Sequence, residues 1–464
     1  MRLKLLALAA ALAAPVVLGQ GSGGDLPTAV LTYSGSLSGA AEAPPNASPG
    51  SGTTTVTYDS TAHLLGLSVN FTGLLGNTTA AHIHCCTSVP GVGTAGVATQ
   101  TPTFSGFPLG VTSGTYSNTF DLTLAPSWNA AFITANGGTP AGAEAALAAG
   151  LAAGRAYLNI HTSSFPGGEI RAFLGFAKGD FNSDGLPDLV FRQVSNGAHN
   201  KVWFMDGVTR TSEAAITPDA ASTAWLIRGV DDFDDFATPG SGRDNKNDLV
   251  FWNQATGNVE FWLMNGTNRP GAAVPLTGGA VLPTNWDLSA TADFSHDGRA
   301  DIVWRNFTSQ KIVIWKMGEG AVPGTQKTGN IIPTPDQAVD PNWLIVAAAD
   351  YSGDGNTDFL WYNYSSGRIV TWYMDTAVVR TSGQFTTPNA AGDFNWKVVA
   401  GSDYSRTYVP GTPPLGSPDI VWRNETSGNQ VVWHLDFNST RVHGQFTNPT
   451  SNTPALDWVI VGPR

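Results

Sequence analysis

The 464-residue sequence has very little cysteine and little charge. Its two cysteines, Cys85 and Cys86, are adjacent, so they cannot form the disulfide framework of a small secreted domain. Charged residues make up 13% of the chain, and beyond the N-terminus no apolar run is long enough to span a membrane. The formal net charge of −12 argues against nucleic acid or an anionic membrane as a partner, although aspartates that bind metal ions would reduce the effective charge.

Turn-forming residues are abundant instead. The chain contains 53 Gly and 29 Pro, a composition that suits short strands joined by many turns. Its length is sufficient for two or three domains. We therefore expect an all-β protein with more than one domain.

The N-terminus has the pattern of a signal peptide over residues 1–19. Arg2 and Lys4 precede the apolar stretch 5–18, and Gly19 is a suitable small residue before a cleavage site. Residues 20–30 then read as a short leader. We expect the mature chain to be secreted, or periplasmic in a Gram-negative cell, where calcium is plentiful and thiols oxidise.

Residues 31–174 form a first domain in which strand-like alternation is broken by Gly, Pro and Asn clusters. Segments 53–58, 64–71 and 157–161 are typical of such strands. The alanine-rich segment 141–155 follows Pro140 and is the one helix that the pattern predicts here.

Residues 175–464 repeat a unit of several short strands. Each unit has an Asp-rich turn, a strand ending in an aromatic residue, a strand with a central Trp, and a strand that begins with Trp. The aromatic residues are Phe191, Phe251, Trp304, Trp361 and Trp422; the central ones are Trp203, Trp262, Trp315, Trp372 and Trp433; the last ones are Trp225, Trp286, Trp343, Trp396 and Trp458. A period of about 40–60 residues with several strands is typical of propeller blades. Because no Asp turn follows Trp458, its strand should return to the first turn and close a ring of about five blades.

The Asp turns indicate calcium. Oxygen side chains at positions 1, 3 and 5 of a tight loop converge on one point, Gly at position 6 permits the turn, and Asp at position 9 completes the ligand shell. The candidate ligands are Asp180, Asn182, Asp184, Asp188, Asp232, Asp234, Asp244, Asp248, Asp293, Ser295, Asp297, Asp301, Asp350, Ser352, Asp354 and Asp358. The fifth turn keeps only Asp403, Ser405 and Asp419, so we expect it to bind calcium weakly or not at all. Turns stabilised by their own side chains, without an ion, are the alternative.

The repeated Asp-x-(Asn/Ser)-x-Asp-Gly-x-x-Asp motif resembles the VCBS / FG-GAP repeat family over residues 175–464. This resemblance implies a calcium-loop propeller of the kind found in adhesion and lectin-like extracellular proteins. It is specific for the fold and says little about the ligand.

Three histidines stand out in the first domain. His82 and His84 are two residues apart and so share one face of a strand, while His161 lies on the polar face of another strand. If these strands are neighbours, the three imidazoles converge as copper or zinc ligands. The alternative is that they form ordinary structural hydrogen bonds. Cys85 and Cys86 fit a vicinal disulfide, soft ligands for Cu(I), or a bridge between chains.

The first domain resembles the CHRD (chordin-type) domain family. The residues that carry the resemblance are the segments 38–45, 80–84, 159–162 and 167–171. The family implies a β-sandwich-like fold and leaves the biochemistry open.

Together these features predict an extracellular binding or adhesion protein with a calcium-stabilised propeller and a glycan or protein ligand. Trp252, Tyr362, Asn306 and Asn424 are candidates either for sugar contacts or for blade packing. The alternative function is a copper-dependent redox protein that uses the three histidines. No segment resembles a catalytic triad or a phosphate-binding loop, and we assign no catalytic residue.

Overall fold

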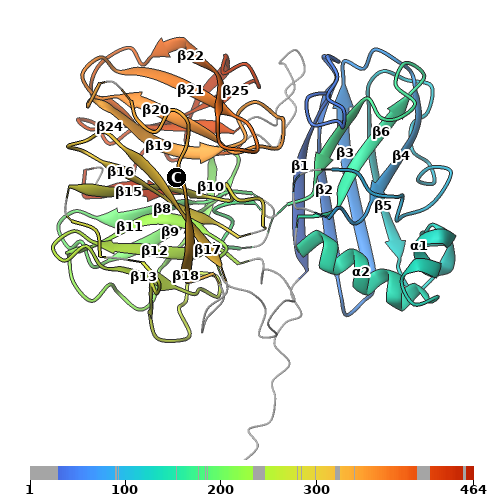
Figure 1. The fold of residues 1–464 in the computed structure, drawn as a ribbon, viewed down its shortest axis with the longest axis horizontal. Helices are drawn as coiled ribbons and strands as arrows, with labels where there is room; N and C mark the ends of the chain where they lie inside the picture. Colours follow the sequence, from blue (N-terminus) through green and yellow to red (C-terminus); the bar gives the residue numbers. More distant parts are fainter. Residues whose placement is uncertain are drawn as a thin grey trace, which may run out of the picture.

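The computed structural model describes residues 30–464 except for some short stretches. These exceptions are residues 89–90, 92, 153, 176, 183, 185, 234–245, 280, 284, 298, 319–323, 339, 405–417 and 453–455. The expected signal peptide, nearly all of the leader and the candidate ligands Asp234, Asp244 and Ser405 lie outside the described residues. The described chain is almost entirely β, with two domains side by side (Figure 1). No helix in these residues is both long and apolar enough to cross a bilayer.

The N-terminal domain is one curled antiparallel sheet of seven strands. The strands are β1 (Leu31–Ser38), β2 (Ser51–Asp59), β3 (Leu64–Thr72), β4 (Thr78–His84), β5 (Gly114–Asp121), β6 (Tyr157–Thr162) and β7 (Ile170–Phe173). Their order in the sheet is β4-β6-β7-β1-β2-β3-β5. The two halves of the sheet face each other across one core, in which Ile83 and Ile160 from one half join Val56 and Val69 from the other. This curling gives the sandwich-like domain expected from the sequence (Figure 1).

Helices cover one end of this sheet. The predicted helix is α2 (Pro140–Ala152), whose Leu147 and Leu151 are buried in the core. The sequence pattern missed two shorter elements, the 3-10 helix η1 (Ala125–Ser127) and α1 (Ala130–Ala135). The side chain of Asn129 caps α1 by accepting a hydrogen bond from the Ala131 N–H. A helix of six residues is too short to show a hydrophobic period, so this cap is the feature of the sequence that could have indicated it.

The C-terminal domain has five four-stranded antiparallel sheets, which form a five-bladed propeller. Blade 1 contains β8 (Leu189–Gln193), β9 (Asn200–Asp206), β10 (Thr209–Ala215) and β27 (Trp458–Gly462). Blade 2 contains β11 (Trp225–Asp231), β12 (Asp248–Asn253), β13 (Val259–Trp262) and β14 (Val274–Pro275). Blade 3 contains β15 (Trp286–Ala292), β16 (Asp301–Asn306), β17 (Ile312–Gly318) and β18 (Gln326–Ile331). Blade 4 contains β19 (Trp343–Ala349), β20 (Asp358–Asn363), β21 (Arg368–Met374) and β22 (Arg380–Ala390). Blade 5 contains β23 (Trp396–Ser402), β24 (Asp419–Asn424), β25 (Gln430–Leu435) and β26 (Arg441–Phe446).

The ring closes as the repeats predict. The last strand, β27, pairs antiparallel with β8, so that Trp458 lies opposite Gln193. The innermost strands of neighbouring blades are also in contact around the ring, including β27 with both β11 and β23. Five turns and one returning strand therefore make five blades.

Aromatic pairs hold each blade together. The aromatic residue of the second strand packs against the central Trp of the third, with ring centroids 4.7 Å apart for Phe191–Trp203 and 4.8 Å apart for Trp422–Trp433. The second-strand rings of all five blades are fully buried. Each pair is worth about 0.5–1.5 kcal/mol beyond the burial of its area. The repeated Trp pattern is thus the sequence signature of blade packing.

The aspartate at position 9 of each turn has a structural role in every blade. In blade 1 the carboxylate of Asp188 accepts the N–H of Phe181 (2.8 Å) from the turn and the N–H of Met205 (2.9 Å) from β9. Asp248, Asp301, Asp358 and Asp419 accept corresponding pairs of N–H groups. This aspartate clamp joins the turn to the third strand, because both N–H groups would otherwise be buried without partners.

Candidate functional site

The three histidines of the first domain lie on adjacent strands of one sheet. Strand β4 pairs with β6, so that His82 is opposite Asn159 and Ala80 is opposite His161. Ile83 and Ile160 point into the core, which directs the histidines to the other face of the curled sheet. The strand order, which places β6 rather than β5 beside β4, is what brings His161 to the pair.

Each imidazole is held by one backbone carbonyl. His82 Nε2 lies 2.7 Å from the Pro102 oxygen, His84 Nδ1 lies 2.9 Å from the Ala95 oxygen, and His161 Nδ1 lies 3.0 Å from the Pro166 oxygen. A carbonyl oxygen can only accept, so these three ring nitrogens carry the protons. These carbonyls could not be predicted from the sequence, because every residue type carries the same backbone acceptor.

The remaining ring nitrogens, His82 Nδ1, His84 Nε2 and His161 Nε2, therefore carry lone pairs. They are buried and have no hydrogen-bond partner, and the ligand atoms of the three rings lie within 4.8 Å of one another. Burial lowers the pKa of all three imidazoles, to about 4 for His84, and a charge on a neighbouring ring would lower the pKa of His82 and His84 further. The trio is thus neutral at pH 7, which is the form that binds metal.

This arrangement matches a mononuclear site for copper or zinc. Both metals accept imidazole nitrogen, and small rotations of the rings would bring ligand atoms that lie within 4.8 Å of one another to the spacing that metal–nitrogen bonds of about 2.0–2.1 Å require. A proton-bearing nitrogen on a carbonyl is also the usual way in which a protein orients a metal-binding histidine. In the described part of the chain, no other group of three His, Cys, Asp or Glu side chains comes as close together. Three protein ligands would leave a fourth position to water or to a small ligand.

A buried polar cluster lies beside the trio on the same face. Asn159 donates to Glu42 (3.4 Å), and burial raises the pKa of Glu42 to about 7 despite the opposing charge of Arg171. The Arg171 guanidinium lies over the ring of Tyr157, which in turn stacks on His84. A positive charge that close favours neutral His84. Asn159 and Arg171 belong to the segments that resemble the CHRD family, so the sequence singled them out, but their contacts with Glu42 and Tyr157 could not be predicted from it.

Glu169, in the segment 167–171 that resembles the CHRD family, has a structural role. Its carboxylate accepts hydrogen bonds from Ser48, Thr162, Leu75 and Gly76. Burial acts to raise the pKa of Glu169, but these four donors outweigh it and lower the pKa. Glu169 therefore joins loops at the end of the sheet, and the histidine rings are held by backbone carbonyls instead.

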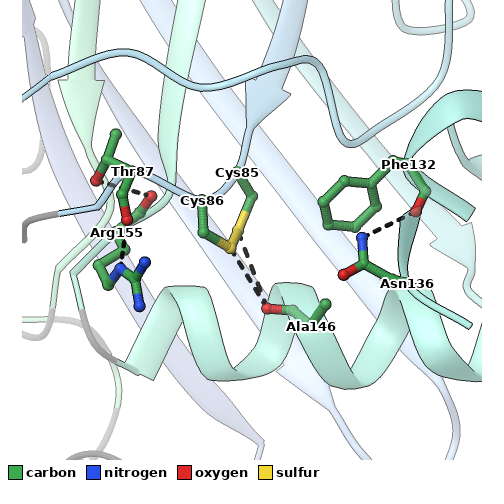
Figure 2. Close-up of a disulfide and its surroundings, with 7 residues drawn as sticks. All are labelled: Cys85, Cys86, Thr87, Phe132, Asn136, Ala146 and Arg155. Atoms are coloured by element: carbon green, nitrogen blue, oxygen red, sulfur yellow. Dashed lines mark hydrogen bonds between the residues drawn. A yellow bond between two sulfur atoms is a disulfide. The ribbon is translucent and has the colours of Figure 1, made fainter.

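The two cysteines directly after His84 form a vicinal disulfide (Figure 2). Their sulfur atoms pack on helix α2, 3.9 and 3.5 Å from the Ala146 carbonyl oxygen. A side chain at Gly150 would collide with both sulfurs, so the glycine makes this close packing possible. The pair is oxidised within one chain, and neither the Cu(I)-thiolate nor the interchain alternative applies to it.

In the turns of blades 1, 3 and 4 that are predicted to bind calcium, the first aspartate accepts backbone N–H groups of the described residues. In blade 4, Asp350 accepts the backbone N–H groups of Gly353 (2.7 Å), Asp354 (3.1 Å) and Gly355 (2.8 Å), and Gly355 has a φ of +86°. In blades 1 and 3 the first aspartate likewise accepts from the fifth residue, from Asp184 to Asp180 and from Asp297 to Asp293. These hydrogen bonds hold the backbone of each loop against its first aspartate.

Carboxyl groups are crowded in these turns. Burial, reinforced by the charges of Asp180 and Asp184, raises the pKa of Asp188 to about 8. Burial with Asp293 and Asp297 raises the pKa of Asp301 to about 7, and the pKa values of Asp350 and Asp358 are raised for the same reasons. A bound cation would relieve this repulsion.

Blades 2 and 5 differ from this pattern. In blade 2, Asp232 and Asp248 are buried, while the inserted part of the motif lies outside the described residues. In blade 5, His434 Nδ1 lies 2.9 Å from Asp419 Oδ2. Burial acts to lower the pKa of His434, but the contact with Asp419 prevails and raises it. The turn with the weakest motif thus has an imidazole against its carboxylate.

The four candidates for either sugar contacts or blade packing are packing residues. Trp252, Tyr362, Asn306 and Asn424 are all buried. The side-chain oxygens of Asn306 and Asn424 accept N–H groups of the following turns, which accounts for the asparagine at the end of these strands.

Comparison with known proteins finds a family match within each domain. Residues 33–174 match the model of the CHRD domain, and residues 293–361 match that of the FG-GAP-like repeat. A search of curated proteins finds no match. Among solved structures, an auxiliary nutrient binding protein from Bacteroides thetaiotaomicron aligns at 9% identity and a TM-score of 0.31, covering 83% of this chain and 84% of that one.

Proposed function

We propose that this chain is an exported binding protein in which the CHRD domain holds one copper or zinc ion and the propeller presents a surface for an extracellular ligand. One observation supports the metal site above all. Three neutral imidazoles direct unpartnered lone pairs at one another, and each ring is fixed by a backbone carbonyl. A buried acceptor without a donor is costly, so such a trio is best explained by a cation.

Metal binding is proposed in preference to the redox alternative. The geometry accounts for holding an ion: the ligands are preorganised, neutral and buried. The ion would supply Lewis acidity at the fourth position, while His82, His84 and His161 would hold it and Arg171 would favour neutral His84.

Calcium has a structural role in this proposal. Its sites would be the turns of blades 1, 3 and 4, where crowded carboxyl groups favour a divalent cation and oxygen ligands favour calcium. The signal-peptide pattern supports export to a compartment with enough calcium. The propeller fits a binding role, and its partner in this proposal is a glycan or a protein.

Isothermal titration of the chelator-treated full chain with Cu²⁺ and with Zn²⁺ tests the metal site. We expect one ion per chain for at least one of the two metals. Mutation of a residue that only orients a ligand typically weakens binding by about 10–100-fold, so His84→Ala, which removes a ligand, should weaken it at least as much.

His199→Ala is the matched control, because His199 lies on the propeller surface and pairs with Asp219 (2.8 Å). It should bind as the unmodified chain does. If neither metal binds with a stoichiometry near one, or if His84→Ala and His199→Ala behave alike, the three histidines are structural and the proposed metal function is wrong.

A further inference from the structure

Every blade has a basic side chain stacked on the Trp of its third strand. The distances from the cation to the ring centroid are 4.8 Å for Arg210–Trp203, 4.2 Å for Arg269–Trp262, 5.2 Å for Lys327–Trp315, 4.7 Å for Arg380–Trp372 and 4.8 Å for Arg441–Trp433. The blades share this feature but differ in what lies beside the indole. A charged side chain beside the indole fills the groove, and a small residue at the same place leaves it open.

In blade 1 the groove beside the indole is filled by the chain itself. Glu213 lies opposite Trp203 in the sheet and accepts its Nε1–H (2.8 Å). Lys201 bonds to Glu213 (3.1 Å) and lies 4.4 Å from the ring centroid of Trp458. In blade 2, Glu260 likewise accepts the Nε1–H of Trp262 (2.9 Å). A charged side chain thus lies beside the third-strand indole in both blades.

In blade 4 both charged residues are replaced by small ones. Gly383 lies opposite Trp372, where blade 1 has Glu213, and Val370 takes the place of Lys201. A side chain at Gly383 would point toward the edge of Trp372 that carries Nε1, at about the van der Waals distance. The result is a cavity of about 360 Å³. It is lined chiefly by Trp343, Trp361, Trp372, Phe385, Asp340 and Arg380.

The cavity combines flat aromatic walls with polar groups at its edge. Trp343 and Phe385 have ring centroids 6.2 Å apart, and Phe385 is 41% exposed. The carboxylate of Asp340 is fixed by Asn342 and Asn363, and the guanidinium of Arg380 lies over Trp372. Its volume is at the small end of the range for ligand sites. This suits one ring with apolar faces and a polar rim.

We propose that this groove of blade 4 binds a single neutral pyranose residue of a glycan. The apolar face of the sugar would lie on the aromatic walls, and its hydroxyls would bond to Asp340, Arg380 and the Trp372 Nε1–H. The acidic net charge of the chain disfavours an anionic sugar. The inference extends the binding role proposed above for the propeller and assigns it a ligand class and a site.

Blade 5 repeats the same set of residues. Gly444 lies opposite Trp433, and Phe446 is 6.2 Å from Trp396 between ring centroids. The turn Asp393-x-Asn395 before Trp396 also matches Asp340-x-Asn342 before Trp343, with an Asn N–H bonded to the Asp in both. These matching residues extend the proposal to blade 5.

Two glycine-to-glutamate changes test the inference by giving blades 4 and 5 the side chain that fills blade 1. Neither glycine has a positive φ, and a Cβ at Gly383 meets no atom closer than 3.5 Å, so the strands can accept Gly383→Glu and Gly444→Glu. Ser382→Glu is the matched control, since its side chain lies on the opposite face of β22. The probes are the methyl glycosides of D-glucose, D-galactose, D-mannose and D-xylose, titrated by ligand-observed NMR.

We expect the unmodified chain and Ser382→Glu to bind at least one of these glycosides with a dissociation constant in the millimolar range. Gly383→Glu should lose about half of the sites, and the double variant should bind at least tenfold more weakly. If no glycoside binds the unmodified chain, or if the double variant binds as well as the control, the inference is wrong. In the second case the propeller still binds sugar, so only this site assignment fails, and the metal titration remains an independent test.

Discussion

The variant Asp297→Asn separates calcium binding from blade folding. Asp297 is at position 5 of the blade 3 turn, where its carboxylate accepts the N–H of Arg299 (3.1 Å) and pairs with Lys316 (3.2 Å). Asparagine keeps the size and the acceptor oxygen but removes the charge that would bind calcium. Asp419→Asn is the comparison, because Asp419 clamps blade 5, where we expect little or no calcium.

The size of the effect follows from linkage. A site at a calcium concentration one hundred times its dissociation constant adds about 2.7 kcal/mol to the free energy of unfolding. For a domain of this size, that corresponds to a rise in Tm of about 5–10 °C. A tenfold loss of affinity in Asp297→Asn would remove about 1.4 kcal/mol of this gain, or about 3–5 °C. Asp419→Asn should lower the Tm itself and leave the calcium-dependent rise unchanged.

The pH dependence provides a second readout. Burial raises the folded-state pKa of Asp188 to about 8 and of Asp301 to about 7, above the unfolded value near 3.9. A carboxyl group with a raised pKa destabilises the fold as pH climbs from the unfolded toward the folded value. The calcium-free propeller should therefore be more stable at pH 5 than at pH 7. Bound calcium favours the charged form, so its stabilising effect should be larger at pH 7.

Differential scanning calorimetry of the chelator-treated chain, with and without added calcium at both pH values, measures these effects. Equal melting curves with and without calcium would refute calcium binding by the turns. Equal calcium-dependent rises in the unmodified chain and Asp297→Asn would show that the blade 3 turn is not a site.

Three further outcomes are expected. Deletion of residues 458–464 should give an oligomeric or insoluble product on size-exclusion chromatography, because it exposes the edge of β8; a monomer with normal melting would contradict ring closure. Because the folded-state pKa of His434 is raised, its pairing with Asp419 stabilises the fold fully below about pH 6.5, and this stabilisation is lost as pH rises through the folded pKa. His434→Gln should therefore reduce the fall in Tm between pH 6 and 8, and the same fall in the variant would contradict this role of His434. Gly150→Ala should lower the Tm by several degrees, and this loss should shrink when Cys85 and Cys86 are both alanine; equal losses in the two backgrounds would mean that the disulfide is not what the glycine accommodates.

The propeller could be predicted from the sequence because its information is local and repeated. Each turn, aromatic residue and Trp occurs at the same place in five units, and the missing turn after Trp458 revealed the closure. The role of the aspartate at position 9 of each turn could be predicted only in part. Its spacing suggests a metal ligand, whereas its contacts to the third strand can be seen only once the strands are paired. Asp419 therefore makes the same structural contacts as the other four, although its turn has lost most of the motif.

The histidine site shows the opposite case. Alternation placed His82 and His84 on one face, but their meeting with His161 depends on β6 being the neighbour of β4, which is a matter of topology. The carbonyl groups that orient the rings come from loops and have no signature in residue type. The blade 4 groove was missed for a similar reason, since Gly383 matters only through its position opposite Trp372.

The ring closure also has a consequence for the order of folding. The first blade takes its innermost strand from the far end of the chain, and the bond between the Ser195 N–H and Asp457 spans 262 positions. Contacts so distant in sequence slow folding, because much of the chain must be ordered before they form. Until β27 arrives, β8 offers an unpaired edge that invites association with other chains. A chain interrupted before β27 therefore keeps an exposed strand edge, which β27 covers once it pairs with β8.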